Sequence, residues 1–168
     1  MDGTQKSDLA AGTAANGAVT ISRRIEWDMA HRLGPKCATK CRNLHGHRYT
    51  ALATLAAETT TELGMVLDFG DAIRAMKGFI DGSLDHACIV DRRDVALLEF
   101  LTEQGDKRCE VEFPTTVENL CAWLAGQFQV AFDALPGAAE RGVRLVALRV
   151  FETPNCYADW TLSGSSRP

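Results

Sequence analysis

Segments with the two-residue periodicity of β-strands lie near both ends of this chain, and segments with helical periodicity lie between them. Residues 19–29 and 48–57 are rich in β-branched side chains that alternate with polar ones, which predicts two strands. Residues 145–152 and 157–162 predict two closing strands around a Thr-Pro-Asn turn. Two hairpins flanking helices favour an α+β domain, with a four-stranded antiparallel sheet covered by helices on one face.

The middle of the chain supplies the predicted helices. Apolar residues recur at helical spacing in three segments, residues 71–80, 94–104 and 115–132. The last is the clearest, because Pro114 precedes it and Thr115 and Glu118 have capping-box spacing. Residues 65–69 form a short apolar run that predicts one further small strand.

The length and net charge of the chain narrow the classes of protein to which it can belong. A chain of 168 residues predicts a single domain over residues 19–168, preceded by a flexible tail, residues 1–18, that is rich in Gly, Ala, Thr and Ser. The net charge of −4 gives no reason to expect a nucleic-acid partner. No apolar run approaches the ~20 residues that cross a bilayer, and the N-terminus lacks the pattern of a secretory signal. We expect a cytoplasmic protein without a membrane partner.

The six cysteines are scattered, and a chain of this length does not need covalent cross-links to be stable. We therefore expect reduced thiols. Cys37 and Cys41 share a loop rich in Lys and Arg, where cations favour the thiolate form. Cys37 is thus a possible second reactive thiol, or a disulfide partner for Cys41 under oxidation.

The four histidines predict a metal site. His45 and His47 project from the same face if their segment is a strand, and His31 joins them if its own strand is a neighbour. Three imidazoles with an open fourth position are the ligand set of a catalytic zinc. Two alternatives stay open: solvated strand histidines, and a closed structural zinc with Cys41 as its fourth ligand.

Three further groups are candidates for chemistry. Cys41 is a possible base or nucleophile beside a metal. Asp85 precedes the fourth histidine, His86, and an aspartate that orients a histidine for proton transfer is a recurrent device; a helix-cap aspartate beside a surface histidine is the simpler interpretation. Glu152 ends a predicted strand, either solvated or presented in a pocket to a cationic or amidine-like edge.

Taken together, these motifs resemble the 6-pyruvoyl-tetrahydropterin synthase superfamily. The resemblance runs from about Ile21 to Trp160 and keeps the order of the motifs. These are Ala30-His31-Arg32-Leu33, Cys41-x-x-x-His45-Gly46-His47-x-Tyr49, Val66-Leu67-Asp68-Phe69, Leu84-Asp85-His86, Pro114-Thr115-Thr116-Val117-Glu118-Asn119-Leu120 and Phe151-Glu152-Thr153-Pro154.

The resemblance implies a tunnelling fold, in which subunits join their sheets into a barrel and two rings stack, usually as a hexamer. It implies the substrate 7,8-dihydroneopterin triphosphate. It also assigns roles by motif position: zinc binding to His31, His45 and His47; proton transfer to Cys41, Asp85 and His86; and recognition of the pterin to Glu152, Thr115 and Thr116.

The spacing of three residues between Cys41 and His45 is similar to the bacterial 6-carboxytetrahydropterin synthase branch, which serves queuosine biosynthesis. That branch releases triphosphate and acetaldehyde. One alternative is the pyruvoyl-forming reaction, which eliminates triphosphate alone. The other is a non-catalytic, zinc-stabilised module that binds a pterin or a nucleotide.

Overall fold

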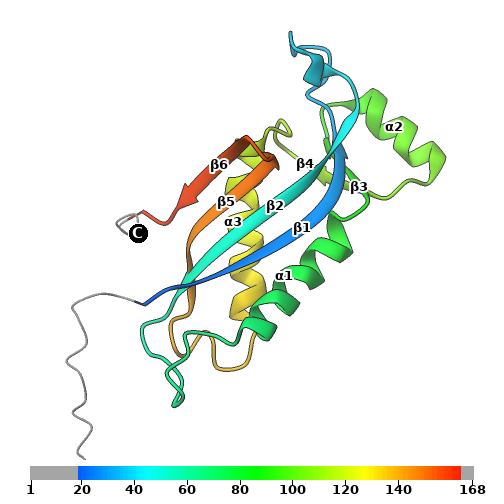
Figure 1. Ribbon diagram of the computed structural model, residues 1–168. Coiled ribbons are helices and arrows are strands. Elements are labelled where there is room, and N and C mark those ends of the chain that lie inside the picture. The colour runs from blue at the N-terminus through cyan, green and yellow to red at the C-terminus, as the bar shows by residue number, and fades with distance from the viewer. Residues whose placement is uncertain (1–18, 164–168) are drawn as a thin grey trace, which may run out of the picture.

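The computed structural model describes residues 19–163 and shows an α+β fold (Figure 1). The predicted tail, residues 1–18, lies outside the described residues. Within the described part, no helix is both long and apolar enough to span a bilayer. The elements in chain order are β1 (Ile21–His31), β2 (His45–Ala56), α1 (Phe69–Ser83), β3 (Ala87–Asp91), α2 (Val95–Gln104), β4 (Arg108–Val111), α3 (Val117–Asp133), β5 (Arg144–Thr153) and β6 (Cys156–Thr161).

The four predicted main strands are confirmed, but the predicted strand count is wrong. The sheet has six strands in the order β4-β3-β1-β2-β5-β6. Its antiparallel part is β1-β2-β5-β6, and two parallel strands, β3 and β4, extend it beyond β1. Strand β3 was missed because Ala87 to Val90 are all buried, so it lacks the alternation that marks a half-exposed strand, and β4 was missed because it has only four residues.

Helices α1 and α3 cover the face formed by the odd-numbered residues of β1 and β2. This face begins with Ile25 and Leu55 and continues through Trp27 and Tyr49, which are register partners with stacked rings 5.5 Å apart. Burial of this apolar stripe against Met76, Leu124 and Phe128 of the helices forms the main core. The stripe ends in the three histidines His31, His45 and His47.

Helix α2 packs on the opposite face, so the prediction of helices on one face is wrong. Its Leu97 and Leu101 form a second, smaller core with Cys88 and Val90 of β3. Cys88 is the register partner of Ala30, which alternates with the residues of the main core. Both faces of β3 are therefore covered (Figure 1).

Two local predictions also need correction. Residues 65–69 form no strand; Val66 and Leu67 are buried in a turn, and Asp68 caps α1 by accepting hydrogen bonds from Gly70 N and Asp71 N. Helix α3 is capped by Thr116, not Thr115: the Thr116 hydroxyl accepts from Asn119 N. Because Thr116 is the cap, the carbonyl and hydroxyl of Thr115 can bond to His31 and Arg32 instead.

Candidate metal centre

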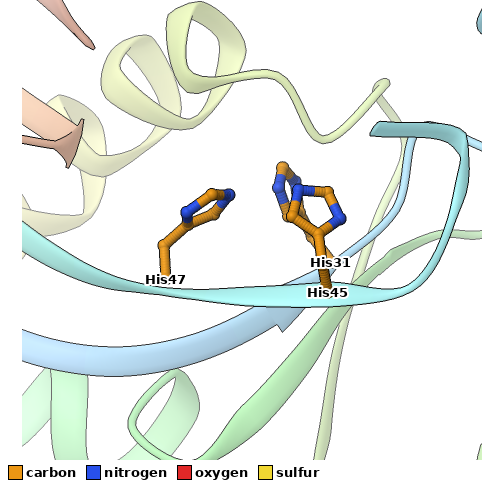
Figure 2. A group of neighbouring side chains, drawn as sticks. All are labelled: His31, His45 and His47. Atoms are coloured by element: carbon orange, nitrogen blue, oxygen red, sulfur yellow. The ribbon is translucent and has the colours of Figure 1, made fainter. Parts of the chain in front are cut away.

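Two strands bring the three predicted metal ligands together. His31, the last residue of β1, is the register partner of His45, and His47 is the partner of Met29. All three side chains lie on the main-core face of the sheet and converge (Figure 2). Their ring centroids are 4.6 to 5.4 Å apart, and one ring nitrogen from each lies within 4.8 Å of the others.

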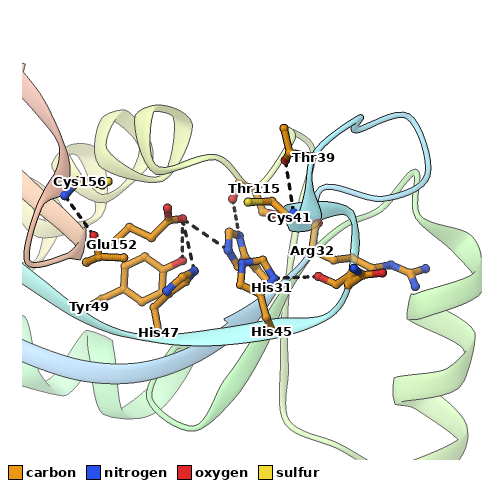
Figure 3. Close-up of polar contacts among 12 residues, drawn as sticks. His31, Arg32, Thr39, Cys41, His45, His47, Tyr49, Thr115, Glu152 and Cys156 are labelled. Carbon is orange, nitrogen blue, oxygen red and sulfur yellow. Dashed lines mark hydrogen bonds and ion pairs between the residues drawn. The ribbon is translucent and has the colours of Figure 1, made fainter.

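Main-chain carbonyls fix two of these rings. His31 Nδ1 donates to Thr115 O at 2.7 Å, and His45 Nδ1 donates to Asn43 O at 2.8 Å (Figure 3). A proton on Nδ1 leaves the lone pair on Nε2, which is the arrangement that second-shell partners impose on metal-binding histidines. These contacts give both imidazoles the tautomer that a metal requires.

The remaining nitrogens have the character of ligands. Nε2 of His31 and Nε2 of His47 are buried and have no hydrogen-bond partner, which is costly unless another group binds there. Burial lowers the pKa of His31 and of His47, partly opposed by the charge of Glu152, so the neutral form that binds metals is favoured. The residues present therefore fit a metal ion.

Glu152 lies beside this group. Its Oε1 is 3.4 Å from His31 Nε2 and 4.0 Å from His47 Nε2, and Tyr49 donates its phenol proton to the same oxygen over 3.5 Å (Figure 3). Burial, followed by the carboxylate, raises the pKa of Tyr49, so the phenol stays a donor. Tyr49 entered the sequence analysis only as a motif position. His45, His47 and Tyr49 are alternate residues of β2, and this two-residue spacing is the sequence signal that puts Tyr49 on the same face as the histidines.

Cys41 lines a cavity together with His31, but it does not belong to the three-imidazole group. It lies in a short 3-10 helix, Lys40–Arg42, whose N-cap Thr39 accepts from Cys41 N at 3.3 Å. The three imidazoles form the metal-capable cluster without its sulfur. A cavity of about 480 Å³ has walls that include His31, Cys41, Thr116, Glu152, Asn155 and Cys156. An acid or base at Cys41 would thus face a ligand held in this pocket.

Asp85 and His86 lie outside the cavity that contains His31 and Cys41. Ala30 and Cys88 face α2, and His86 lines a separate groove of about 590 Å³ whose wall also includes Ala30, Arg48 and His47. Within one chain, neither member of the predicted proton-transfer pair lines the cavity that contains Cys41 and Glu152.

The geometry of the Asp85–His86 pair is otherwise that of an oriented imidazole. His86 Nδ1 and Asp85 Oδ2 are 2.9 Å apart, and this contact lowers the pKa of Asp85. His86 has a φ of 56°, a left-handed conformation that is unfavourable for a side chain with a Cβ. Its backbone N–H donates to Asp28 O at 2.8 Å, and Lys107 Nζ donates to Asp85 O at 2.8 Å. Such strain at an exposed polar turn is typical of functional sites.

Comparisons with known proteins identify the family of the chain. The family model described as 6-pyruvoyl tetrahydropterin synthase matches residues 20–162. A protein of Rickettsia bellii named 6-carboxy-5,6,7,8-tetrahydropterin synthase is 34% identical over 144 residues, which cover 84% of this chain and 99% of that protein. One of the same name from Aquifex aeolicus is 42% identical over 129 residues, which cover 74% of this chain and 78% of that protein.

A solved structure of Caenorhabditis elegans 6-pyruvoyl tetrahydropterin synthase shares the fold with a TM-score of 0.61 and 22% identity, covering 88% of this chain and 97% of that one. The family match thus spans the whole fold, from β1 to β6. The chain belongs to the 6-pyruvoyl tetrahydropterin synthase family.

Proposed function

We propose that this protein converts 7,8-dihydroneopterin triphosphate and one water to 6-carboxy-5,6,7,8-tetrahydropterin, releasing triphosphate and acetaldehyde, with zinc bound by His31, His45 and His47. The observation that carries this proposal is one pocket whose wall contains His31, Cys41 and Glu152, beside three imidazoles that each bring one ring nitrogen within 4.8 Å of the others. The names of the relatives support the carboxy product.

The residue types suit the steps of this reaction. Zinc, when bound, supplies a Lewis acid beside the substrate hydroxyl groups. Cys41, as a thiolate, accepts a carbon-bound proton, and His86, oriented by Asp85, returns one. Glu152 accepts the paired amino and ring N–H donors of the pterin, and Thr116 stands at the same pocket wall.

The product mixture tests the reaction. Purified, zinc-loaded protein is incubated with the triphosphate substrate, and the products are identified by mass spectrometry, with acetaldehyde trapped as a hydrazone. We expect the carboxypterin and acetaldehyde in equal amounts. A pyruvoyl product without acetaldehyde would establish the sister reaction, whereas binding without turnover would establish a binding module.

Assembly supplies the residues that one chain keeps apart. The outer edge of β1 pairs with β3 only at Met29 and Ala30, and β6 ends the antiparallel part of the sheet. A β6 strand set beside the free length of β1 in another copy continues the antiparallel order and closes into a ring. We propose that a neighbouring subunit brings its Asp85 and His86 to the pocket.

Light scattering tests this assembly. At low micromolar concentration we expect a mass several times the 18.3 kDa of one chain, with a hexamer as the expected species. Dilution that dissociates the assembly should also abolish turnover, because each pocket then lacks its proton-transfer pair. A stable monomer with full activity would contradict the proposal.

Glu152→Gln tests recognition of the pterin. The variant keeps the shape of the side chain but replaces one acceptor oxygen with a donor, so one of two hydrogen bonds to the pterin becomes a donor–donor contact. A loss of about 2–4 kcal/mol, or roughly 30- to 1,000-fold in kcat/KM, is expected from leaving buried polar groups unpaired, with zinc content unchanged.

Glu26→Gln is the matched control for this variant. Glu26 and Glu152 line one groove, but Glu26 lies on the opposite face from the histidines and pairs with Arg24. Its substitution removes the same charge at little cost in kcat/KM. If Glu152→Gln instead loses zinc while pterin binding persists, the carboxylate is a metal ligand and its assignment to the pterin is wrong.

A further inference from the structure

Thr115 makes two hydrogen bonds that join the turn before α3 to the end of β1. It is a buried polar residue, 3% exposed. Its carbonyl oxygen accepts from His31 Nδ1 at 2.7 Å, and its hydroxyl donates to Arg32 O at 3.0 Å. The two bonds connect Thr115 to two adjacent residues, His31 and Arg32. They therefore fix both the distance and the rotation of Thr115 relative to the end of β1.

The partner segment is itself fixed. The Arg32 guanidinium donates two hydrogen bonds of 2.6 Å to the two oxygens of Asp94, the N-cap of α2. Bidentate pairs of this kind restrict both side chains. The Arg32 carbonyl, which accepts the hydrogen bond from the Thr115 hydroxyl, is therefore held in a fixed position.

These contacts determine how His31 presents its free nitrogen. The Thr115 carbonyl holds the proton on Nδ1, and the opposite nitrogen, Nε2, is buried without a hydrogen bond and lies 3.4 Å from Glu152 Oε1, on a ring of the three-imidazole group. If the hydroxyl bond is lost, only the flanking peptide positions the carbonyl. The ring then gains rotational freedom and access to the other tautomer.

We infer that Thr115 is a positioning residue for the metal ligand His31, acting through its hydroxyl bond to Arg32 and its carbonyl bond to the imidazole. The inference rests on the proposed zinc site. It differs from the role in pterin binding that the family resemblance implies for Thr115, because the hydroxyl and carbonyl are both engaged with β1. Thr116 is the neighbouring residue that remains at the pocket wall.

Thr115→Val tests the inference, because valine keeps the shape and removes the hydroxyl. Zinc affinity is measured by competition with a chromogenic chelator. Loss of an outer-shell partner weakens metal binding by about 10- to 100-fold; Thr115→Val keeps the carbonyl partner and removes only the hydroxyl bond that anchors it, so we expect a loss at the lower end, about 10-fold. Thr115→Ser, which restores the donor, should bind zinc within about threefold of the unaltered protein.

Thr50→Val is the matched control, since Thr50 is also a buried threonine but lies on β2 facing away from the histidines. Its zinc affinity should not change. Thr115→Ala provides a second variant without the hydroxyl if valine prevents folding. Nitrogen-15 NMR of the zinc-free proteins supplies a readout independent of turnover: the Nδ1–H signal of His31 should be retained in Thr115→Ser and lost or exchange-broadened in Thr115→Val.

The outcomes separate this inference from the proposed function. Unchanged zinc affinity in both hydroxyl-free variants, together with a raised KM, would overturn the inference and return Thr115 to the substrate site. Failure of the unaltered protein to bind zinc would overturn the zinc-dependent function itself. Weaker zinc binding with an unchanged KM at saturating zinc supports the positioning role.

Discussion

Replacing His47 by alanine is expected to remove nearly all zinc from the purified protein. Only the imidazoles of His31 and His45 would then remain to bind the ion. Zinc sites in proteins use three or four protein ligands. We expect an occupancy below about a tenth after dialysis against a weak chelator, because even outer-shell losses reduce metal affinity 10- to 100-fold and a direct ligand contributes more. Metal analysis by plasma mass spectrometry measures the result.

His47 is a cleaner position for this test than His31. Its side chain is 19% exposed, against 2% for His31. Removal of the buried His31 ring would also leave a cavity and deprive the Thr115 carbonyl of its donor. His45→Ala should repeat the His47→Ala result.

His86→Ala is the control for zinc content. It removes an imidazole of the same size from an exposed turn outside the cavity that contains His31 and Cys41, so its zinc content should equal that of the unaltered protein. Full zinc occupancy in both His45→Ala and His47→Ala would refute the assignment of the metal centre.

The shared face of His45 and His47 could be predicted from sequence because the two-residue period of a strand is a local property. Once residues around His45 form a strand, His45 and His47 must share a face. The position of His31 needed the register of β1 and β2, which depends on the long connection of residues 32–44. The structure places His31 directly opposite His45.

The position of Asp85 and His86 could not be read from sequence. It depends on the parallel pairing of β3 with β1 at only two positions, Met29 with Ala87 and Ala30 with Cys88. The run before α1, containing Val66 and Leu67, misled for a different reason: burial of two apolar residues in a turn has the same local composition as a short strand.

The role of Thr115 was hidden because main-chain groups leave no mark in a sequence. A threonine beside a helix start predicts a cap, and both Thr115 and Thr116 satisfy that pattern. Only the structure shows that Thr116 is the cap and that Thr115 binds back to β1.

Cys41→Ala is expected to lower kcat by about 10²- to 10⁴-fold, the contribution of a positioned acid or base, while leaving zinc and fold in place. The main chain around Cys41 is held without the thiol: Leu33 N donates to Cys41 O at 2.9 Å, and Cys41 N donates to the Thr39 hydroxyl. Alanine can therefore adopt the same turn. Because the sulfur lies outside the three-imidazole cluster, its removal should not change zinc affinity.

Cys37→Ala is the matched control, since Cys37 lies in the same loop but outside the pocket wall that contains Cys41. Its hydrogen bond with the Thr39 hydroxyl lowers the pKa of the Cys37 thiol. Cys37 therefore has the chemistry of an alternative reactive thiol, although it lies outside the pocket wall. Steady-state kinetics and zinc analysis of both variants distinguish the roles. Loss of zinc in Cys41→Ala would make Cys41 a ligand and close the site to catalysis, and loss of turnover in Cys37→Ala alone would move the proton-transfer role to that thiol.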